Sequence, residues 1–242
     1  MSATCGFFIW WKGLNDDIVK TESFEELLTL ITREGNLMGF SYFSLIIKHA
    51  VPFTQPCIDF FGNYPDEWVD RYKRKKYLHI DPVFLAVENT QYTIAWLNGL
   101  KRENATIFLE SKEYGINDGF SQSAIGNDGA LRVLSFSGES LIKNVDTDLL
   151  KLKINCISGL INARMNDFES YPSQLILPSL SLKEKEILRW TGDGKIAEEI
   201  GTISNISEST VNFHICNILK KFNAPNKTLA AAYGAACRLL TR

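Results

Sequence analysis

The 242-residue sequence has no paired-cysteine motif and no long apolar run. Its five cysteines stand far apart, at Cys5, Cys57, Cys156, Cys216 and Cys237. Without a CxxC or zinc-finger spacing, they are typical of reduced thiols in a cytoplasmic protein and predict no metal site. No segment approaches the roughly 20 apolar residues of a membrane span. The apolar run Gly6–Trp11 is too short for a signal peptide and follows no basic region.

Net charge is also small, at -2, and it excludes no class of partner. The average hides an asymmetry, because residues 180–242 carry nine basic and six acidic side chains, whereas the rest of the chain carries 17 and 22. A basic C-terminal segment on an otherwise acidic chain is typical of a phosphate-binding module, although the net charge of this segment is only +3. Hydrophobic residues make up 45% of the chain, enough for well-packed cores, and the length suits either one large domain or a medium domain plus a small one.

The N-terminal part alternates between helical and strand-like patterns. Ser23 is expected to cap a helix whose apolar positions are Phe24, Leu27, Leu28 and Ile31. Strands are expected over Phe40–Lys48, Cys57–Phe61 and Ala130–Phe136. Further helices are expected from Pro65 to about Tyr77 and over Asp146–Phe168. The apolar stripe of the second is expected at Leu149, Leu152, Ile154, Ile157, Leu160 and Ile161. Helices outside a central sheet predict an α+β fold with an N-terminal α/β/α sandwich.

After a linker, the C-terminal part predicts helices only. The first opens near Leu180 and ends at Gly194, and Lys195–Ile200 forms a second, short helix. Ser207 is a good N-cap for the third helix, and Asn226 can cap a final helix that reaches Leu240. The core stripe of the third helix is Val211, Ile215, Ile218, Leu219 and Phe222. A short helix, a turn and a capped helix form the geometry that places a second helix in the major groove of DNA.

The outer side of this third helix carries groups suited to DNA. Ser209 and Thr210 at its start suit phosphate oxygens, Asn212 suits a base edge, and Phe213 suits a thymine methyl. The other expected contacts are Lys195, Cys216, Lys220, Lys221 and Lys227. The plain alternative is a four-helix packing unit with a solvated outer face, and an outward Phe213 argues against it.

Residues 180–237 resemble the DNA-binding domain of LuxR-type regulators. The family's pattern is present as Glu184, Leu188 and Gly194, then as Glu199-Ile200-Gly201, Ile206–Val211 and His214. Three positions depart from it. Gly201 replaces the usual Ala, and Cys216 stands where many relatives have a basic residue. Ser204 stands where the family has Leu, so either Ile203 or Ile206 has to fill that core space.

A second group of candidate site residues lies in the N-terminal part, and these residues suit a small-molecule ligand. Tyr64, Trp68 and Tyr72 stand at i, i+4 and i+8, near one helix face, and Asp81-Pro82 and Trp96 follow. Buried together, an indole N–H, a phenol O–H and a carboxylate match a neutral ligand with two carbonyls and one amide N–H. The residues Leu131, Val133 and Ser135 alternate onto one strand face that can line the same cavity. The plain alternative is an aromatic core stripe with an Asp-Pro turn.

Residues 36–165 resemble the autoinducer-binding domain of LuxR-type quorum-sensing receptors, because the motif Tyr-x3-Trp-x3-Tyr, with Asp-Pro thirteen residues after the Trp, is intact. Other stretches look especially like the SdiA group of these receptors. The resemblance implies an N-acyl-homoserine lactone ligand, with Trp68 on the lactone carbonyl, Asp81 on the amide N–H and Tyr64 on the amide carbonyl. It also implies that Tyr72 and Trp96 wall the pocket and that Ser135 adds a polar contact. Phe60, Leu131 and Val133 are the other expected ligand contacts.

The expected organisation is a ligand-binding domain at 1–170, a linker at 171–178 and a helix-turn-helix domain at 179–242. Expected partners are double-stranded DNA, an acyl-homoserine lactone, a second copy of the chain and RNA polymerase, with no membrane. One rival is a phosphorylation-driven response regulator, but Asp16-Asp17 follows no hydrophobic strand. The other is an enzyme using Asp66, Asp70 or Asp81, but no nucleophile–base pair is visible and the three histidines are dispersed.

Overall fold

The chain folds as two compact units. The structure is a computed structural model that describes residues 3–90, 92–96, 105–139, 146–168 and 171–240. The first unit lies within residues 1–47, 59–126 and 131–172, and the second within 48–58, 127–130 and 173–242. The expected domain end at residue 170 falls outside the described residues.

A five-stranded sheet organises the first unit, in the order β2-β1-β5-β4-β3. The strands are β1 (Tyr42–Lys48), β2 (Ile58–Gly62), β3 (Ile94–Ala95), β4 (Asp118–Ile125) and β5 (Leu131–Gly138). β4 pairs antiparallel with β3 and β5, and its register with β5 sets Phe120 opposite Phe136 and Ser121 opposite Ser135. Because successive side chains point to opposite faces, the phenylalanine pair and the serine pair lie on different sides of the sheet.

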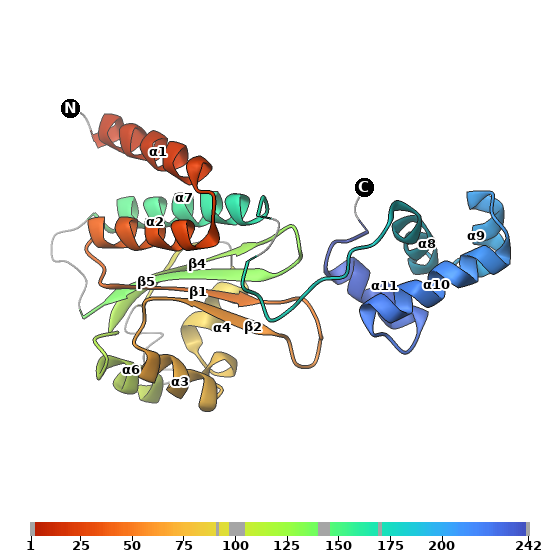
Figure 1. Cartoon of the computed structure of the whole chain (residues 1–242). Coiled ribbons are helices and arrows are strands. Elements are labelled where there is room, and N and C mark those ends of the chain that lie inside the picture. Colours follow the sequence, from red (N-terminus) through yellow and green to blue (C-terminus); the bar gives the residue numbers. More distant parts are fainter. Residues whose placement is uncertain (1–2, 91, 97–104, 140–145, 169–170, 241–242) are drawn as a thin grey trace. The chain divides into compact units, whose positions relative to one another are not determined.

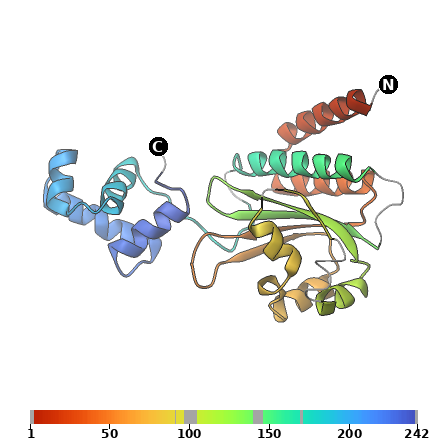
Figure 2. The ribbon, with the colours of Figure 1, turned by 180° about the vertical axis from the view of Figure 1, so that it is seen from behind.

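Helices cover both faces of this sheet. Figures 1 and 2 show α2 (Phe24–Leu37) and α7 (Thr147–Met165) on one face. The other face carries α3 (Asp66–Arg74), the short helix η1 (Tyr77–His79), α4 (Pro82–Glu88) and α6 (Ala105–Lys112). A further helix, α1 (Ala3–Lys20), packs on α7 and α2. The predicted α/β/α sandwich is therefore confirmed.

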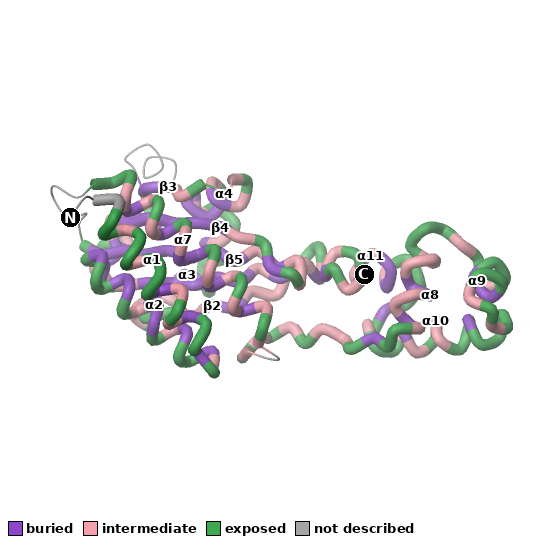
Figure 3. Tube along the Cα trace, turned by 90° about the horizontal axis from the view of Figure 1, so that it is seen from above, coloured by how far each residue is buried: buried purple, intermediate pink, exposed green. Residues whose placement is uncertain are grey.

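The main core lies between the sheet and the inner sides of α2 and α7, and Figure 3 shows buried positions concentrated along the strands. Helix α7 buries Leu150, Ile154, Ile157, Ile161 and Met165, which stand at helical spacing. The predicted stripe was wrong at Leu152, whose surface is 48% exposed. Leu149 and Leu160 are only half-buried, because the helix turns them to the sides of that face.

Side-chain caps fix several helix starts. Ser23 Oγ accepts the backbone N–H of Glu26 at 3.1 Å, and Asp146 caps α7 in the same way. Pro65 stands one residue before α3, and the helix ends at Arg74, earlier than predicted. It ends there because Lys76 has a φ of 53°, in the left-handed region that stops a helix.

The second unit contains four helices in its described C-terminal part: α8 (Leu182–Gly192), α9 (Ala197–Ser204), α10 (Glu208–Phe222) and α11 (Lys227–Ala236). Ser181 and Glu184 form a capping box for α8, while Ser207 and Asn226 cap α10 and α11 as predicted. The boundaries of α9 and α11 differ from the prediction: α9 begins at Ala197 and runs to Ser204, and α11 ends at Ala236. Among the described helices, none combines the length and the apolar character that a bilayer crossing requires.

The turn between α9 and α10 explains two departures from the family pattern. Ile206 packs against the buried cluster of Ile187, Ile200 and Val211, whereas Ile203 is 45% exposed. Ile206 is therefore the residue that fills the space beside Ser204. A Cβ at Gly201 would lie 2.7 Å from the carbonyl oxygen of Ile206, so the turn packs more closely than a side chain at this position allows.

Candidate ligand cavity and nucleic-acid interface

A cavity of about 50 Å³ lies between the sheet and the helices α3, α4 and α6. Its walls are mostly apolar and aromatic, with a few hydroxyls and one carboxylate. The lining residues are Ser44, Ile46, Phe60, Tyr64, Trp68, Tyr72, Asp81, Val83, Phe84, Trp96, Ile107, Phe108, Ser111, Ile116, Val133 and Ser135. A mostly apolar space with few convergent polar groups is typical of a small-molecule site.

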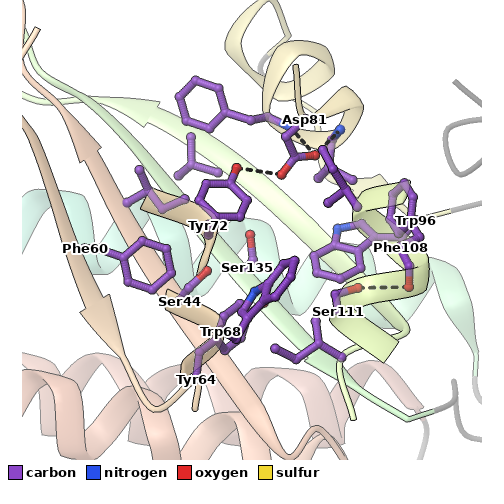
Figure 4. A pocket seen from close by; sticks show the side chains of 16 residues that line it. Ser44, Phe60, Tyr64, Trp68, Tyr72, Asp81, Trp96, Phe108, Ser111 and Ser135 are labelled. Atoms are coloured by element: carbon purple, nitrogen blue, oxygen red, sulfur yellow. Dashed lines mark hydrogen bonds between the residues drawn. The ribbon is translucent and has the colours of Figure 1, made fainter. Parts of the chain in front are cut away.

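Asp81 is held at the start of α4. Its Oδ1 accepts the backbone N–H of Val83 at 2.8 Å, so the carboxylate is the N-cap of this helix, and Pro82 occupies the first helical position. Its Oδ2 accepts the hydroxyl of Tyr72 at 2.7 Å (Figure 4). Two carboxylate oxygens have about four acceptor sites, so Asp81 retains capacity for one more donor in the cavity.

Trp68 and Tyr64 direct donors into the same space. Trp68 is buried against Tyr72 and Tyr114, with ring centroids 5.9 and 5.8 Å away. No described residue accepts a hydrogen bond from its Nε1. Tyr64 accepts a hydrogen bond from Ser137 Oγ at 2.9 Å, which leaves its own hydroxyl proton to be donated. The cavity therefore presents an indole N–H and a phenol O–H.

A chain of hydrogen bonds runs beneath the opposite wall. Trp96 Nε1 donates to Ser121 Oγ at 2.9 Å, and Ser121 Oγ lies 2.7 Å from Ser135 Oγ. Ser135 lines the cavity, whereas Ser121 is fully buried behind it. The cross-strand register of β4 and β5 creates this contact, because it sets the two serines directly opposite one another.

Burial controls the protonation of these groups. It raises the pKa of Tyr64 to about 12, although hydrogen bonds from Ser137 and Ser44 oppose the shift. Burial and the nearby charge of Asp81 also raise the pKa of Tyr72 well above its usual value. Both phenols are therefore donors at neutral pH. Burial raises the pKa of Asp81 as well, against the hydrogen bonds that Tyr72 and two backbone N–H groups donate to it.

The structure brings together eight of the nine residues predicted to bind the ligand. The exception is Leu131, which begins β5 on the same face as Val133 but is not part of the cavity wall. Sequence reasoning missed Ser44, Ile46, Val83, Phe84, Ile107, Phe108, Ser111 and Ile116. Val83 and Phe84 had a usable signal, since they directly follow Asp81-Pro82. The three wall residues of α6 stand in no motif.

The outer side of α10 is a candidate interface for nucleic acid. Thr210, Asn212 and Cys216 are exposed there, and Phe213 is 62% exposed. The stripe on the opposite side packs into the domain, where Val211 and Ile218 are buried and Ile215, Leu219 and Phe222 lie against them. Ser207 Oγ accepts the backbone N–H of Thr210 at 3.1 Å, while Ser209 stays exposed.

The basic residues predicted near this interface differ in their partners. Lys220 and Lys227 are exposed, and no described residue pairs with them. Lys195 lies 3.2 Å from Glu199 on the surface. Lys221 is committed within the domain, because its Nζ donates to the buried Glu184 at 2.7 Å and to the carbonyl of Ser179 at 2.9 Å. Lys221 is thus tied to the fold, whereas Lys220 beside it can reach a phosphate.

Two family models match the chain, one in each part of the sequence. Residues 23–165 match the autoinducer binding domain, and residues 178–233 match the bacterial regulatory proteins of the luxR family. The chain belongs to the LuxR family. As a LuxR-family protein with both domains, it is a quorum-sensing transcription regulator and not an enzyme. It binds DNA through its helix-turn-helix and a small-molecule autoinducer through its N-terminal domain.

Two curated LuxR-family relatives match nearly the whole chain. The quorum-sensing regulator RhlR of Pseudomonas aeruginosa is 35% identical over 97% of this chain and 98% of its own. The regulatory protein SdiA of Escherichia coli is 37% identical over 97% of this chain and 98% of its own length. A crystal structure of SdiA superimposes with a TM-score of 0.87 at 36% identity, over 98% of this chain and 100% of that one. A second SdiA structure, in complex with octanoyl-rac-glycerol, superimposes with a TM-score of 0.88 at 36% identity. The match covers 98% of this chain and 97% of that one.

Proposed function

We propose that the autoinducer is an N-acyl-homoserine lactone held by the cavity of the N-terminal domain. The observation that carries this proposal is the convergence of two donors and one acceptor inside an apolar wall. Trp68 Nε1 donates to the lactone carbonyl, Tyr64 donates to the amide carbonyl, and Asp81 accepts the amide N–H. Tyr72 and Trp96 form the walls, and Ser135 adds a polar contact. The cited hydrogen bonds leave each of these groups with the capacity this assignment requires.

The cavity is too small to hold the acyl chain of such a ligand without movement of its lining side chains. About 50 Å³ accommodates only a few water molecules, whereas sites for drug-sized ligands measure roughly 300–1,000 Å³. Binding of an acyl chain therefore requires lining side chains such as Phe60 and Phe108 to move outward. A ligand that bridges the walls and fills this space should stabilise the domain by mass action.

An acylglycerol is a second candidate ligand. SdiA, similar to this chain over its whole length, has been crystallised with octanoyl-rac-glycerol. A glycerol hydroxyl can donate to Asp81 as an amide N–H does, and an ester carbonyl can accept from Trp68 or Tyr64. The two candidates differ in the group that meets Asp81, so competition between them reports which is preferred.

We also propose the arrangement of the whole regulator. The ligand domain spans residues 1–170, the linker 171–178 and the DNA-binding domain 179–242. Two copies bind a two-fold DNA site, since operators read by helix-turn-helix dimers mirror the protein's symmetry. Asn212 reads a base edge, with Ser209, Thr210, Phe213 and Cys216 beside it and Lys195, Lys220 and Lys227 near phosphates. The dimer works in the cytoplasm and acts on RNA polymerase.

One experiment tests ligand and DNA together. N-hexanoyl-homoserine lactone is expected to raise the melting temperature of the protein, and Trp68→Phe, which removes the indole N–H and keeps a large ring, is expected to reduce the shift strongly. Asn212→Ala should leave the melting shift intact but cost roughly 1–3 kcal/mol of discrimination between operator and random DNA. A lactone shift of equal size in wild type and Trp68→Phe would place the lactone elsewhere. Unchanged discrimination in Asn212→Ala would reject α10 as the reading helix.

A further inference from the structure

The hydrogen-bond chain behind the cavity wall has a defined direction. An indole N–H can only donate, so Ser121 Oγ accepts the proton of Trp96 at 2.9 Å. Ser121 is fully buried, and the oxygen of Ser135, 2.7 Å away, is the acceptor available to its own proton. If Ser135 donated to Ser121 instead, the proton of Ser121 would be buried without a hydrogen-bond acceptor, which is unfavourable.

The favoured arrangement runs from Trp96 to Ser121 and from Ser121 to Ser135. In it every buried proton of the chain is used, and the one left over belongs to the hydroxyl of Ser135, which lines the cavity. Figure 4 shows Ser135 facing the same space as Trp68 and Tyr72. A hydroxyl whose oxygen already accepts a proton is also polarised as a donor.

We propose that Ser121, which does not line the cavity, is a positioning residue that turns Ser135 into a hydrogen-bond donor toward a carbonyl oxygen of the ligand. This rests on the proposed function of the cavity. With Trp68 and Tyr64, the cavity then offers three donors beside the one carboxylate acceptor, Asp81. Such a site selects oxygen-rich ligands and discriminates against ligands whose polar groups are mainly donors. The carbonyl that meets Ser135 is either the amide carbonyl or a 3-oxo group on the acyl chain.

The strand supplies a matched control. Ser123 lies two residues from Ser121 on the same face of β4 and is also buried, but its hydroxyl donates to the backbone carbonyl of Thr90 at 2.6 Å. Ser123→Ala removes the same atoms from the same strand without touching the chain to Ser135. Ser121→Thr keeps the hydroxyl and therefore should keep the function.

A double-mutant cycle with the full-length protein tests the proposal, with dissociation constants measured for N-hexanoyl-homoserine lactone. Ser121→Ala and Ser135→Ala are each expected to weaken binding roughly fivefold, and the double variant no more than Ser135→Ala alone. Ser121→Thr and Ser123→Ala should stay within about twofold of wild type. Independent effects that multiply in the double variant would overturn the proposal, as would a Ser121→Ala variant that binds like wild type.

Two further arms complete the test. The cycle repeated with the 3-oxohexanoyl lactone separates the carbonyls: equal losses for both ligands assign Ser135 to the amide carbonyl, and a larger loss for the 3-oxo ligand assigns it to the 3-oxo group. If wild type binds neither lactone, the proposed lactone function fails, and the same cycle is run with octanoyl-glycerol, whose ester also offers a carbonyl. Failure of that cycle overturns the role of Ser121 separately.

Discussion

Asp81 has two tasks at once, because the carboxylate that faces the cavity also caps α4 and accepts the hydroxyl of Tyr72. The substitution Asp81→Ala would therefore change both ligand binding and the stability of the fold, and the two effects could not be separated. That variant loses an N-cap worth about 1 kcal/mol and leaves the Tyr72 hydroxyl without its acceptor. A cleaner substitution keeps one of the two oxygens as the cap and removes the charge. The amide NH2 that replaces the other oxygen can donate to the hydroxyl oxygen of Tyr72.

We predict that Asp81→Asn separates these tasks. Burial raises the pKa of Asp81, so the ionised form destabilises the fold, and this loss grows as pH rises through the raised pKa. The neutral Asn still caps α4. At pH 7 its free energy of unfolding should equal or exceed that of wild type, and this advantage should shrink toward pH 4. Lactone binding should weaken, because a charge-assisted hydrogen bond is lost. Denaturant titrations at both pH values, without ligand, check the prediction, and a loss of stability equal to that of Asp81→Ala would contradict it.

The residue scale also shows what the sequence could not predict about the site. Trp68 and Tyr72 could be placed together from their spacing because α3 carries both. Tyr64 stands two residues before that helix, and Asp81 follows within a short distance along the chain. Ser121 has no such signal. Its place behind Ser135 depends on the register of two strands, and register is set by long-range packing rather than by local pattern.

At the scale of elements, the missed strand β4 has a physical reason. Its sequence DGFSQSAI contains Ser121, Gln122 and Ser123 in succession, all buried. Three consecutive polar residues do not resemble a core strand, and they are tolerated only because each is hydrogen-bonded to a distant partner such as Trp96, Thr93 or Thr90. The caps at Ser23, Ser207 and Asn226 were predictable because a cap is a local interaction.

Two adjacent lysines on α10 allow a matched prediction. Lys221 pairs with Glu184, which is buried, so this ion pair joins α10 to α8. Lys221→Met is expected to lower the free energy of unfolding of the C-terminal unit by about 1–2 kcal/mol, since Lys221 itself is partly exposed. Lys220→Met should leave unfolding unchanged but weaken binding to all DNA sequences alike and reduce the salt slope by about one.

The pH dependence of the Lys221 effect has a definite sign. Burial would raise the pKa of Glu184, but Lys221 and Ser181 outweigh it and hold the pKa below its usual value. The pair therefore stabilises the fold above the unfolded pKa, and this stabilisation is lost as pH falls through the folded pKa. The difference between wild type and Lys221→Met should accordingly be present at pH 7 and vanish in acid. A Lys221→Met variant that loses DNA affinity but no stability would show that Lys221 serves the interface instead.

At the scale of the whole molecule, the proposed dimer needs an exposed apolar surface. On α7, Ile154, Ile157 and Ile161 are buried within their own domain, so they cannot also meet a partner. Leu152 can, because its surface is 48% exposed. Leu229 on α11 and Leu240, which follows the end of that helix, pack against the core of their own domain. The sequence pattern alone favours dimer surfaces on the final helix, at Leu229, Ala232, Tyr233, Ala236 and Leu240, and on the long helix near Leu152–Ile161. Burial within each domain leaves fewer of these side chains able to meet a partner.

We predict that Leu152→Glu weakens dimerisation roughly tenfold while leaving lactone-induced stabilisation unchanged, because a charge at an apolar contact loses its hydration when the contact forms. Leu109→Glu is the control, since Leu109 is also exposed, at 67%, but lies on α6. Sedimentation of the lactone-bound protein with a palindromic DNA site checks both. Wild type that sediments as a monomer on that DNA would reject the dimer itself, and equal effects of the two variants would reject α7 as its surface.

The small volume of the cavity has a consequence for the time that a ligand stays bound. Most of its lining side chains are buried, and they come from the strands β1 and β5 and the helices α3, α4 and α6. Because the cavity measures only about 50 Å³, an acyl chain enters or leaves only when lining side chains move, so its residence time depends on protein fluctuations on the scale of microseconds to seconds or longer, and not on diffusion alone. We therefore expect the ligand-bound state of the regulator to persist for some time after the autoinducer outside is removed. When the surrounding autoinducer is diluted, the transcriptional state should decay with the slow dissociation of bound molecules and lag behind the concentration outside.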